Sequence, residues 1–416
     1  MDYVMIFGMV IFIFLFIYLG FILIISIISL FIKKENYNFL AKVSIIIPCY
    51  NEQDNIIKTL ESIKLQKYPL SKIEVIVVDD GSTDHTLKVV NKNRGKLNLR
   101  VLKLKHQGKS SAMNHACKLA KGDFILTIDA DTCMKDDSLK KIIAPFKDKK
   151  VGATSGSMNV FHTDSLMRIF QRIEYHYNNL IRRSFSKVFN TSIWFYGAFA
   201  CYRTKVLRNV GFFSKDTMTE DMDSSMMICK KGYKVVNAYD AIAFTNVPKS
   251  VSDLVRQRMR WWIGGLQVVF KHKKQFSKKS SAAVNFFFIN QYWWSFYALV
   301  LFPILVYQVL YWLPFNLESF SNTFWYLFRW FSLSGPLYVI YMIPEWGISF
   351  YGIFGVMSGI ISAILIIWSI IVFKDKFDFK TLFALFFYFP YTLILNSIIV
   401  ISLIRILFLK TSYFIQ

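Results

Sequence analysis

Residues 43–52 read Val-Ser-Ile-Ile-Ile-Pro-Cys-Tyr-Asn-Glu, an apolar run that changes abruptly into a polar cluster. A short run of this kind predicts a buried strand of a parallel sheet, because helices cover both faces of such sheets. The same change recurs where 73–78 leads into Asp79-Asp-Gly-Ser-Thr-Asp84, and where 123–128 leads into Asp129-Ala-Asp131. The three stretches predict one sheet with three acidic strand ends.

Helical spacing separates these strands. Residues 54–66, 84–91 and 109–120 have apolar positions at helical intervals, and 99–104 reads as a further strand. Alternating strands and helices predict an α/β domain with a parallel-rich sheet, in which ligands bind beyond the carboxyl ends of the strands. Residues from about 160 to 280 mix helices with short strands.

Apolar segments flank this domain. No charged residue lies between Tyr3 and Ile32, and charges are sparse from Asn285 onward, in segments near 287–313, 325–343, 346–373 and 381–409. About 20 apolar residues span a bilayer, so we expect membrane helices at both ends. A cleaved signal peptide is the alternative for the first segment, but it would need a basic start and a shorter apolar core. The predicted division is an N-terminal transmembrane helix (1–34), a cytoplasmic domain with interface helices (35–280) and a membrane domain of about four helices (281–416).

The net charge of +23 is concentrated in the middle of the chain, because only six of the 50 Lys and Arg residues follow Ser280 and none precedes Lys33. Lys33 and Lys34 after the first helix indicate that this end is cytoplasmic, which predicts a multi-pass plasma-membrane protein beside an anionic leaflet. Nucleic acid is not an expected partner, since no DNA- or RNA-binding motif is present. The five cysteines form no Cys-x-x-Cys pair and fit a reduced compartment.

Carboxylates gathered at one sheet edge repel each other unless a cation or a hydrogen-bonding ligand offsets the repulsion. A metal-bound nucleotide does both, because Mg²⁺ and Mn²⁺ take carboxylate and phosphate oxygens. Taken singly, each motif has a plainer interpretation. The cluster 79–84 is also typical of a turn with a helix cap, and Asp129-Ala-Asp131 is also typical of a solvated strand end. The ordered set of three favours the nucleotide site.

The whole series resembles the processive family 2 glycosyltransferases, which make cellulose, chitin, hyaluronan and poly-N-acetylglucosamine. The residues that carry the resemblance are Ser44-Ile-Ile-Ile-Pro-Cys-Tyr-Asn-Glu52, Val78-Asp-Asp-Gly-Ser-Thr-Asp84, Gly108-Lys109, Asp129-Ala-Asp131, Thr219-Glu-Asp221 and Gln257-Arg-Met-Arg-Trp261. It implies a GT-A type domain that transfers a sugar from a UDP-activated donor. Residues 219–265 most resemble bacterial poly-β-1,6-N-acetylglucosamine synthases.

The resemblance implies a role for each motif residue. The expected nucleotide-sugar contacts are Pro48, Tyr50, Glu52, Asp79, Asp80, Lys109, Asp129, Asp131, Gln257, Arg260 and Trp261. Asp129 and Asp131 are the expected ligands of Mg²⁺ or Mn²⁺. Asp221 is the expected general base, with Glu220 beside it in the catalytic pair, and Gly197 and Trp261 are expected to contact the acceptor.

Two motifs have plainer alternatives. Thr219 followed by two acids is also typical of a helix N-terminus with a threonine cap, which could itself hold Asp221. Gln257, Arg260, Trp261 and Gly264 share one helix face, as they would in an amphipathic helix lying on the membrane.

The implied function is processive, inverting synthesis and export of a β-linked polysaccharide, with UDP-N-acetylglucosamine as the expected donor. The partners would be the donor, the growing polysaccharide, the lipid bilayer and, as in some relatives, a small membrane accessory subunit. Three alternatives stay open: another polymer such as hyaluronan, chitin or a glucan, a non-processive lipid glycosyltransferase, and a nucleotide-gated transporter. Amides and aromatic residues in 285–294 are expected to face the interior of the helix bundle or a conduit, or to form an interfacial belt.

Overall fold

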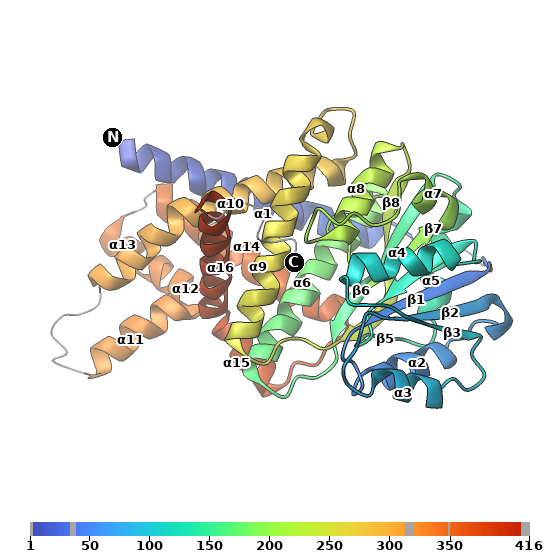
Figure 1. Cartoon of the computed structure of the whole chain (residues 1–416). Coiled ribbons are helices and arrows are strands. Elements are labelled where there is room, and N and C mark those ends of the chain that lie inside the picture. The colour runs from blue at the N-terminus through green and yellow to red at the C-terminus, as the bar shows by residue number, and fades with distance from the viewer. Residues whose placement is uncertain (1–2, 34–38, 313–319, 348–349, 409–416) are drawn as a thin grey trace.

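The computed structural model describes residues 3–33, 39–312, 320–347 and 350–408. A mixed sheet with its covering helices forms one end of the molecule, and long apolar helices form the other (Figure 1). Helices α6 (Leu166–Phe189) and α9 (Val251–Lys271) lie between the two, since α6 packs on both the sheet and α1, and α9 on both α8 and α16.

The sheet follows the order β3-β2-β1-β4-β7-β6-β8-β5. Its strands are β1 (Val43–Cys49), β2 (Ile73–Asp79), β3 (Leu99–Lys103), β4 (Phe124–Ile128), β5 (Cys133–Met134), β6 (Val151–Val160), β7 (Phe199–Arg203) and β8 (Lys234–Thr245). The helices of this end are α2 (Ile56–Lys64), α3 (Thr86–Lys92), α4 (Lys109–Leu119), α5 (Ser138–Ile143), α7 (Thr204–Asn209) and α8 (Glu220–Lys230). The strands and helices expected from 43 to 128 are therefore present, with ends that differ by one or two residues.

Strands β1 to β4 are mutually parallel, whereas β7 inserts antiparallel between β4 and β6. The insertion brings β7, about 70 residues further along the chain, alongside the strand that ends in the acidic pair. It places Gly197, just before β7, near the carboxyl end of β4, where the hydroxyl of Thr127 donates to the Gly197 carbonyl oxygen at 3.0 Å.

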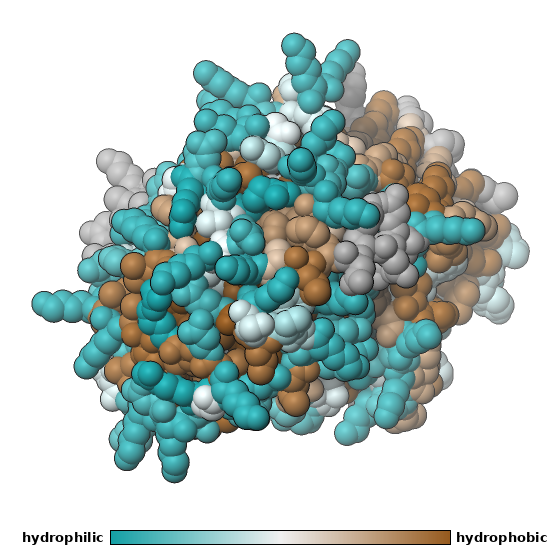
Figure 2. Space-filling view, turned by 90° about the vertical axis from the view of Figure 1, so that its right-hand side faces the viewer, coloured by the Kyte–Doolittle hydropathy of each residue, from teal (hydrophilic) through white to brown (hydrophobic). Residues whose placement is uncertain are grey.

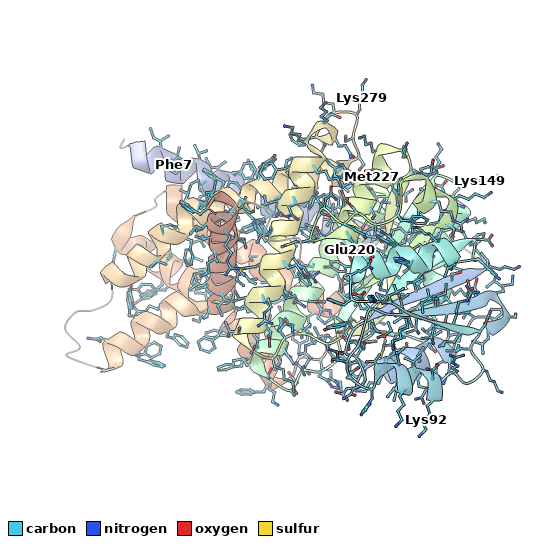
Figure 3. The ribbon with its side chains drawn as sticks, in the orientation of Figure 1. Phe7, Lys92, Lys149, Glu220, Met227 and Lys279 are labelled. Carbon is cyan, nitrogen blue, oxygen red and sulfur yellow. The ribbon has the colours of Figure 1, made fainter. Side chains whose placement is uncertain are left out.

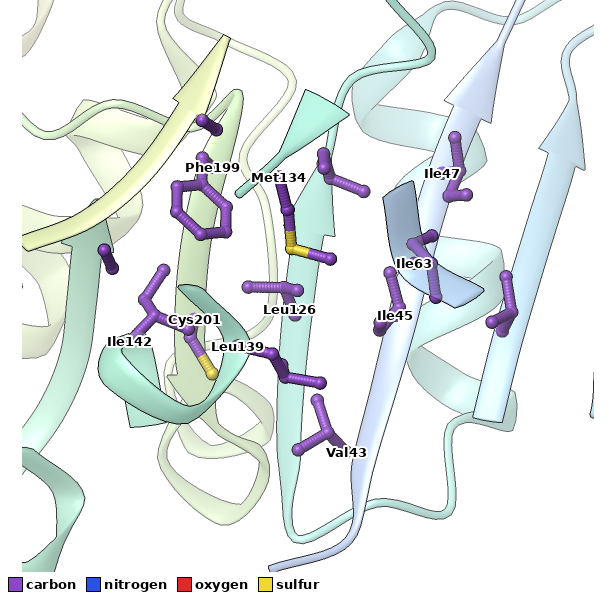
Figure 4. Close-up of a cluster of buried hydrophobic side chains, with 14 of the residues drawn as sticks. Val43, Ile45, Ile47, Ile63, Leu126, Met134, Leu139, Ile142, Phe199 and Cys201 are labelled. Carbon is purple, nitrogen blue, oxygen red and sulfur yellow. The ribbon is translucent and has the colours of Figure 1, made fainter. Parts of the chain in front are cut away.

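Alternate residues of the central strands enter two different cores. Ile45 and Ile47 pack with α2 and α5 on one face of the sheet, and Ile46 packs with α4 on the other. Figure 4 shows the first of these clusters. Because both faces are covered, β1 is apolar at nearly every position, and each buried isoleucine contributes roughly 1.5–3 kcal/mol to stability.

The remaining helices are α1 (Tyr3–Phe31), α10 (Ala282–Trp312), α11 (Phe320–Phe331), α12 (Ser334–Tyr341), α13 (Ile343–Trp346), α14 (Phe350–Val372), α15 (Phe379–Phe386) and α16 (Tyr388–Phe408). Within the described residues, three stretches are long and apolar enough to cross a membrane: Ile6–Phe31, Ile353–Val372 and Tyr388–Phe408. Hydrophilic side chains project from much of the opposite, sheet-bearing end (Figure 2).

The segment 325–343, expected as one membrane helix, is divided between α11 and α12, which have 12 and 8 residues. Neither helix reaches the roughly 20 residues that a bilayer requires. Gly335 and Pro336 lie in the first turn of α12, where proline is tolerated and where continuation of α11 is interrupted.

The polar residues of α10 lie between helices. Asn290 accepts a hydrogen bond of 2.6 Å from the hydroxyl of Tyr18 on α1, and Gln291 donates to the carbonyl oxygen of Trp262 on α9 at 3.4 Å. Both side chains are buried. These two amides therefore face the interior of the helix bundle, which is one of the placements expected for the polar residues of 285–294.

Candidate active site

The carboxyl ends of β1, β2 and β4 meet at one edge of the sheet, because β1 pairs in parallel with both of the others. This edge carries seven of the predicted contacts: Pro48, Tyr50, Glu52, Asp79, Asp80, Asp129 and Asp131. Pro48 lies within β1 opposite Val78, and the Tyr50 ring packs on the His106 ring with centroids 4.4 Å apart. The structure thus brings the three acidic strand ends together.

The two adjacent aspartates at the end of β2 have different surroundings. The Asp80 carboxylate accepts hydrogen bonds from the backbone N–H groups of Gln107 at 2.9 Å and Gly108 at 2.8 Å, and so holds the loop that leads into α4. Asp79 is fully buried, and its Oδ2 has no hydrogen-bond partner among the described residues. A buried carboxylate oxygen without a partner is costly, and no described residue offsets that cost at Asp79.

Lys109, the first residue of α4, lies between the two halves of the site. Its Nζ is 2.5 Å from Oδ1 of Asp129 and 3.9 Å from Oε1 of Glu220. Burial lowers the pKa of this ammonium group, but the two carboxylates outweigh burial and raise it. Lys109 is therefore a fixed positive charge between the strand-end acids and the start of α8.

The strand-end carboxylates are crowded. Burial, with repulsion from Asp129 and Glu52, raises the pKa of Asp131 to about 6, and burial raises the pKa of Glu52 as well. Burial is the larger cause of both shifts, and repulsion between neighbouring carboxylates adds to it. The all-oxygen donor set suits Mg²⁺ or Mn²⁺, and Asp131 has no ion-pair partner among the described residues.

No group of three or more His, Cys, Asp or Glu side chains in the described part of the chain could hold a metal ion. Asp129 and Asp131 would therefore supply only part of a coordination shell. Mg²⁺ usually binds through one or two carboxylates and takes its other ligands from water and substrate phosphates. The two aspartates fit this mode of binding.

Asp221, in the first turn of α8, is held by two backbone N–H groups. Its Oδ2 accepts from Gly197 at 2.6 Å, and its Oδ1 from Met222 at 2.8 Å. Burial raises the pKa of both Asp221 and the adjacent Glu220, while the Lys109 charge opposes the rise. Figure 3 shows Glu220 between α9 and α4 in this view. Glu220 is buried and Asp221 partly buried, and the Lys109 ammonium group lies 3.9 Å from Glu220.

The expected threonine cap is absent. Thr219 is the N-cap residue of α8, but its side chain makes no capping hydrogen bond, and its Oγ1 is buried without a partner among the described residues. Helix α9 packs closely against this side chain, since a Cβ added at Gly264 would lie 2.6 Å from it, and the Met222 N–H donates to Asp221 instead. Asp221 is positioned by Gly197 from outside its helix.

Helix α9 carries the Gln-x-x-Arg-Trp motif along this site. The helix begins after Ser250, whose hydroxyl accepts from the Asp253 N–H at 3.1 Å. The positive charge of Arg260 opposes the rise in the pKa of Glu220 and Asp221. A cavity of about 490 Å³ adjoins this face and is lined by Met218, Pro248, Asp253, Arg256, Gln257, Met259, Arg260, Ile263 and Arg405.

Two buried arginines next to the site had no predicted role. Arg258 stands inside the Gln-x-x-Arg-Trp motif, and Arg182 lies on α6 beneath the Tyr196 ring, 3.7 Å from its centroid. The sequence could have indicated a role only for Arg258, because this residue lies within the Gln-x-x-Arg-Trp motif and immediately follows Gln257. Nothing in the local pattern of α6 distinguishes Arg182 from its neighbour Arg183.

Comparison with known proteins agrees with this site. The sequence profile described as "Glycosyltransferase like family 2" matches residues 41–264, more than half of the chain. A poly-β-1,6-N-acetyl-D-glucosamine synthase of Staphylococcus epidermidis (strain ATCC 35984) is 30% identical over 248 residues, which are 58% of this chain and 59% of that protein. The synthase of the same name from Staphylococcus aureus (strain MSSA476) is 31% identical over 246 residues, 58% of each chain. The match therefore spans about three fifths of these relatives.

The fold also matches a solved structure, that of a mannosyltransferase from Pyrobaculum calidifontis in complex with GDP-Man and Mn²⁺. The TM-score is 0.60 at 20% identity, and the match covers 97% of this chain and 99% of the other. The predicted fold class, a GT-A type domain with apolar helices at both ends, is confirmed. The match to the family profile over residues 41–264 shows that the chain belongs to glycosyltransferase family 2.

Proposed function

We propose that the chain is an inverting, processive glycosyltransferase that polymerises UDP-N-acetylglucosamine into poly-β-1,6-N-acetylglucosamine. The observation that carries the proposal is the partly buried Asp221 carboxylate, which Gly197 holds and whose pKa the Lys109 and Arg260 charges lower against the effect of burial. The name of the staphylococcal relatives supports the choice of sugar and linkage.

The chemistry follows from these groups. The acceptor hydroxyl oxygen attacks the anomeric carbon and forms the new C–O bond, while the bond from that carbon to the β-phosphate oxygen breaks and UDP leaves. Asp221 accepts the hydroxyl proton, for which a buried carboxylate of raised pKa is suited. Attack opposite the leaving group converts an α-linked donor into a β linkage.

Positive charge near the leaving group stabilises the diphosphate as it gains charge. Lys109 and Arg260 would supply it from the protein. Asp129 and Asp131 would hold Mg²⁺ or Mn²⁺, which supplies Lewis-acid stabilisation of the same phosphates when bound. The mannosyltransferase of the same fold was solved with Mn²⁺, so a divalent cation is compatible with the architecture.

The remaining assignments concern the nucleotide and the acceptor. Asp79 and Asp80 would lie at the uridine, with the Tyr50 ring beside them and Pro48 and Glu52 at the same edge. Trp261, with Gln257 on the same helix face, would line the acceptor side, where the 490 Å³ cavity adjoins α9, and Arg260 would lie at the diphosphate. Trp261 remains 36% exposed, which leaves ring surface for stacking against a sugar.

The site would lie on the cytoplasmic side of the plasma membrane. The first apolar helix ends at Phe31 and is followed by Lys33 and Lys34, and such a positive flank faces the cytoplasm. Four basic residues just before α10 would contact the same anionic leaflet: Lys273, Lys274, Lys278 and Lys279.

The proposal is tested with membranes that contain the protein. They are incubated with radiolabelled UDP-N-acetylglucosamine, UDP-glucose, UDP-glucuronate or GDP-mannose separately, each with Mg²⁺ or Mn²⁺. We expect long product from UDP-N-acetylglucosamine alone, digested by a β-1,6-N-acetylglucosaminidase. Product from another donor would identify a different polymer, a single-sugar lipid product would identify a lipid glycosyltransferase, and absence of any transfer would contradict the enzymatic function.

A further inference from the structure

A buried carboxylate joins three helices beside the acceptor face. Glu174 of α6 lies 3.0 Å from the guanidinium Nη2 of Arg258 on α9, and their side chains are 13% and 8% exposed. The Tyr391 hydroxyl of α16 donates to the same Glu174 oxygen. Tyr391 belongs to one of the stretches apolar enough to cross a membrane, so this carboxylate links the catalytic end to the apolar helices.

Arg258 also contacts two of the motif residues. Its Nη1 donates to Oε1 of Gln257 at 2.5 Å, and its guanidinium carbon lies 4.2 Å from the centroid of the Trp261 ring. A planar guanidinium over an aromatic face is a favourable contact, strongest where water is excluded. One buried cation therefore sets both the amide orientation of Gln257 and the ring position of Trp261.

Stability alone does not explain this arrangement. Replacing a buried ion pair by apolar residues of similar volume is often neutral or stabilising, because charges are costly to remove from water. The surroundings of Arg258 are largely apolar and aromatic, including Tyr175 at 6.0 Å from ring centroid to guanidinium. The arginine orients Gln257 and Trp261, which an apolar residue in its place would not do.

We propose that Arg258 is a positioning residue for the acceptor sugar, oriented by Glu174 and Tyr391. It holds Gln257 and Trp261 in the geometry that receives the acceptor. Through Tyr391, the shape of the acceptor side depends on the placement of α16. This inference rests on the proposed glycosyltransferase function and adds to it residues on α6, α9 and α16.

The experiment compares Arg258→Lys, Glu174→Gln and Tyr391→Phe with wild-type full-length protein in detergent. Three quantities are measured with UDP-N-acetylglucosamine: hydrolysis of the donor without acceptor, the KM for a short β-1,6-linked oligosaccharide acceptor, and product length. We expect the acceptor KM to rise about fivefold or more and the product to shorten, while hydrolysis and the donor KM stay within about twofold of wild type.

Arg100→Lys is the matched control, because Arg100 forms a more exposed ion pair with Glu74 at 3.4 Å, on the edge strand β3. Tyr391→Phe removes only a hydroxyl and keeps the test valid if the charge variants do not fold. An unchanged acceptor KM, or a parallel loss of hydrolysis and transfer, would overturn the positioning role alone. A wild type that transfers no sugar would overturn both the role and the proposed function.

Discussion

The backbone N–H of Gly197 donates a hydrogen bond of 2.6 Å to Oδ2 of Asp221, and no room remains between the two residues. A Cβ added at Gly197 would lie 2.5 Å from that oxygen and from the Asp221 Cβ. The loop that precedes β7 therefore fixes the carboxylate proposed as the general base. Gly197 was predicted as an acceptor contact, and the structure shows a direct bond to the proposed base.

This contact predicts the effect of Gly197→Ala. The added methyl group must displace the Asp221 carboxylate, and a shift of about 1 Å in a catalytic group can reduce the rate about 10²-fold. We expect kcat to fall by that factor while the donor KM changes little. Gly20→Ala is the control, since a Cβ there meets nothing within 4 Å. Unchanged kcat in Gly197→Ala would contradict the positioning of the base by Gly197.

Asp221→Asn tests the base itself. Positioned general bases are worth about 10² to 10⁴ in rate, and the amide cannot accept the hydroxyl proton. We expect kcat to fall within that range, with UDP affinity retained in a thermal-shift or equilibrium-binding assay. Asp148→Asn is the control, since Asp148 lies before β6 and forms an exposed pair with Lys234 at 3.3 Å. If UDP affinity and turnover fell together, Asp221 would have a structural role instead.

The pH dependence of turnover follows from the direction of the same shift. Burial raises the pKa of Asp221, so the carboxylate takes up a proton at a higher pH than the ordinary value of about 3.9. The protonated form cannot act as a base, and kcat should therefore decrease as pH falls through the raised pKa. Because Glu220 is adjacent, the midpoint of the pH profile reports the ionisation of both carboxylates and not of Asp221 alone.

The measurement for this prediction is kcat at saturating donor between pH 4.5 and 8, with folding checked by circular dichroism. A constant kcat down to the lowest pH at which the protein stays folded would argue against a carboxylate base of raised pKa.

Asp131→Asn should abolish transfer at Mg²⁺ or Mn²⁺ concentrations that saturate the wild type, because one of the two proposed metal ligands is lost. The control is Asp136→Asn, since Asp136 pairs with the exposed Lys67 at 2.5 Å, outside the crowded carboxylate group. Metal titrations of activity and of thermal stability measure the effect. Full wild-type turnover in excess chelator would contradict the metal assignment.

Export of the product is the last prediction. Vesicles with the catalytic domain outward should convert external donor into polymer that resists added glycosidase until detergent opens the vesicle. Asp221→Asn vesicles control for polymer carried over from the cells. Complete digestion without detergent, in vesicles with and without a co-expressed accessory subunit, would exclude export by this protein.

The sequence alone determined the first half of the sheet and the edge that carries the acids. Val43–Cys49 and Ile73–Asp79 are apolar at nearly every position, and this pattern is local, so it specifies buried strands before any tertiary contact is known. Since parallel strands end on the same edge, the acids after them had to converge. Family membership was readable from the same residues, because the motifs stand at strand and helix ends.

Only the tertiary structure decided which groups touch. Gly197 reaches Asp221 because β7 inserts between β4 and β6, and Thr219 does not cap α8 because Asp221 accepts from the Met222 N–H in its place. Glu174 and Tyr391 meet although 217 residues separate them. Contacts of this kind depend on how helices pack across the molecule. Neither the spacing of apolar residues nor the capping preference of a residue predicts which distant helices pack together. The strand ends could therefore be predicted from local pattern, whereas the residues that orient the proposed base and the acceptor face required the packed chain.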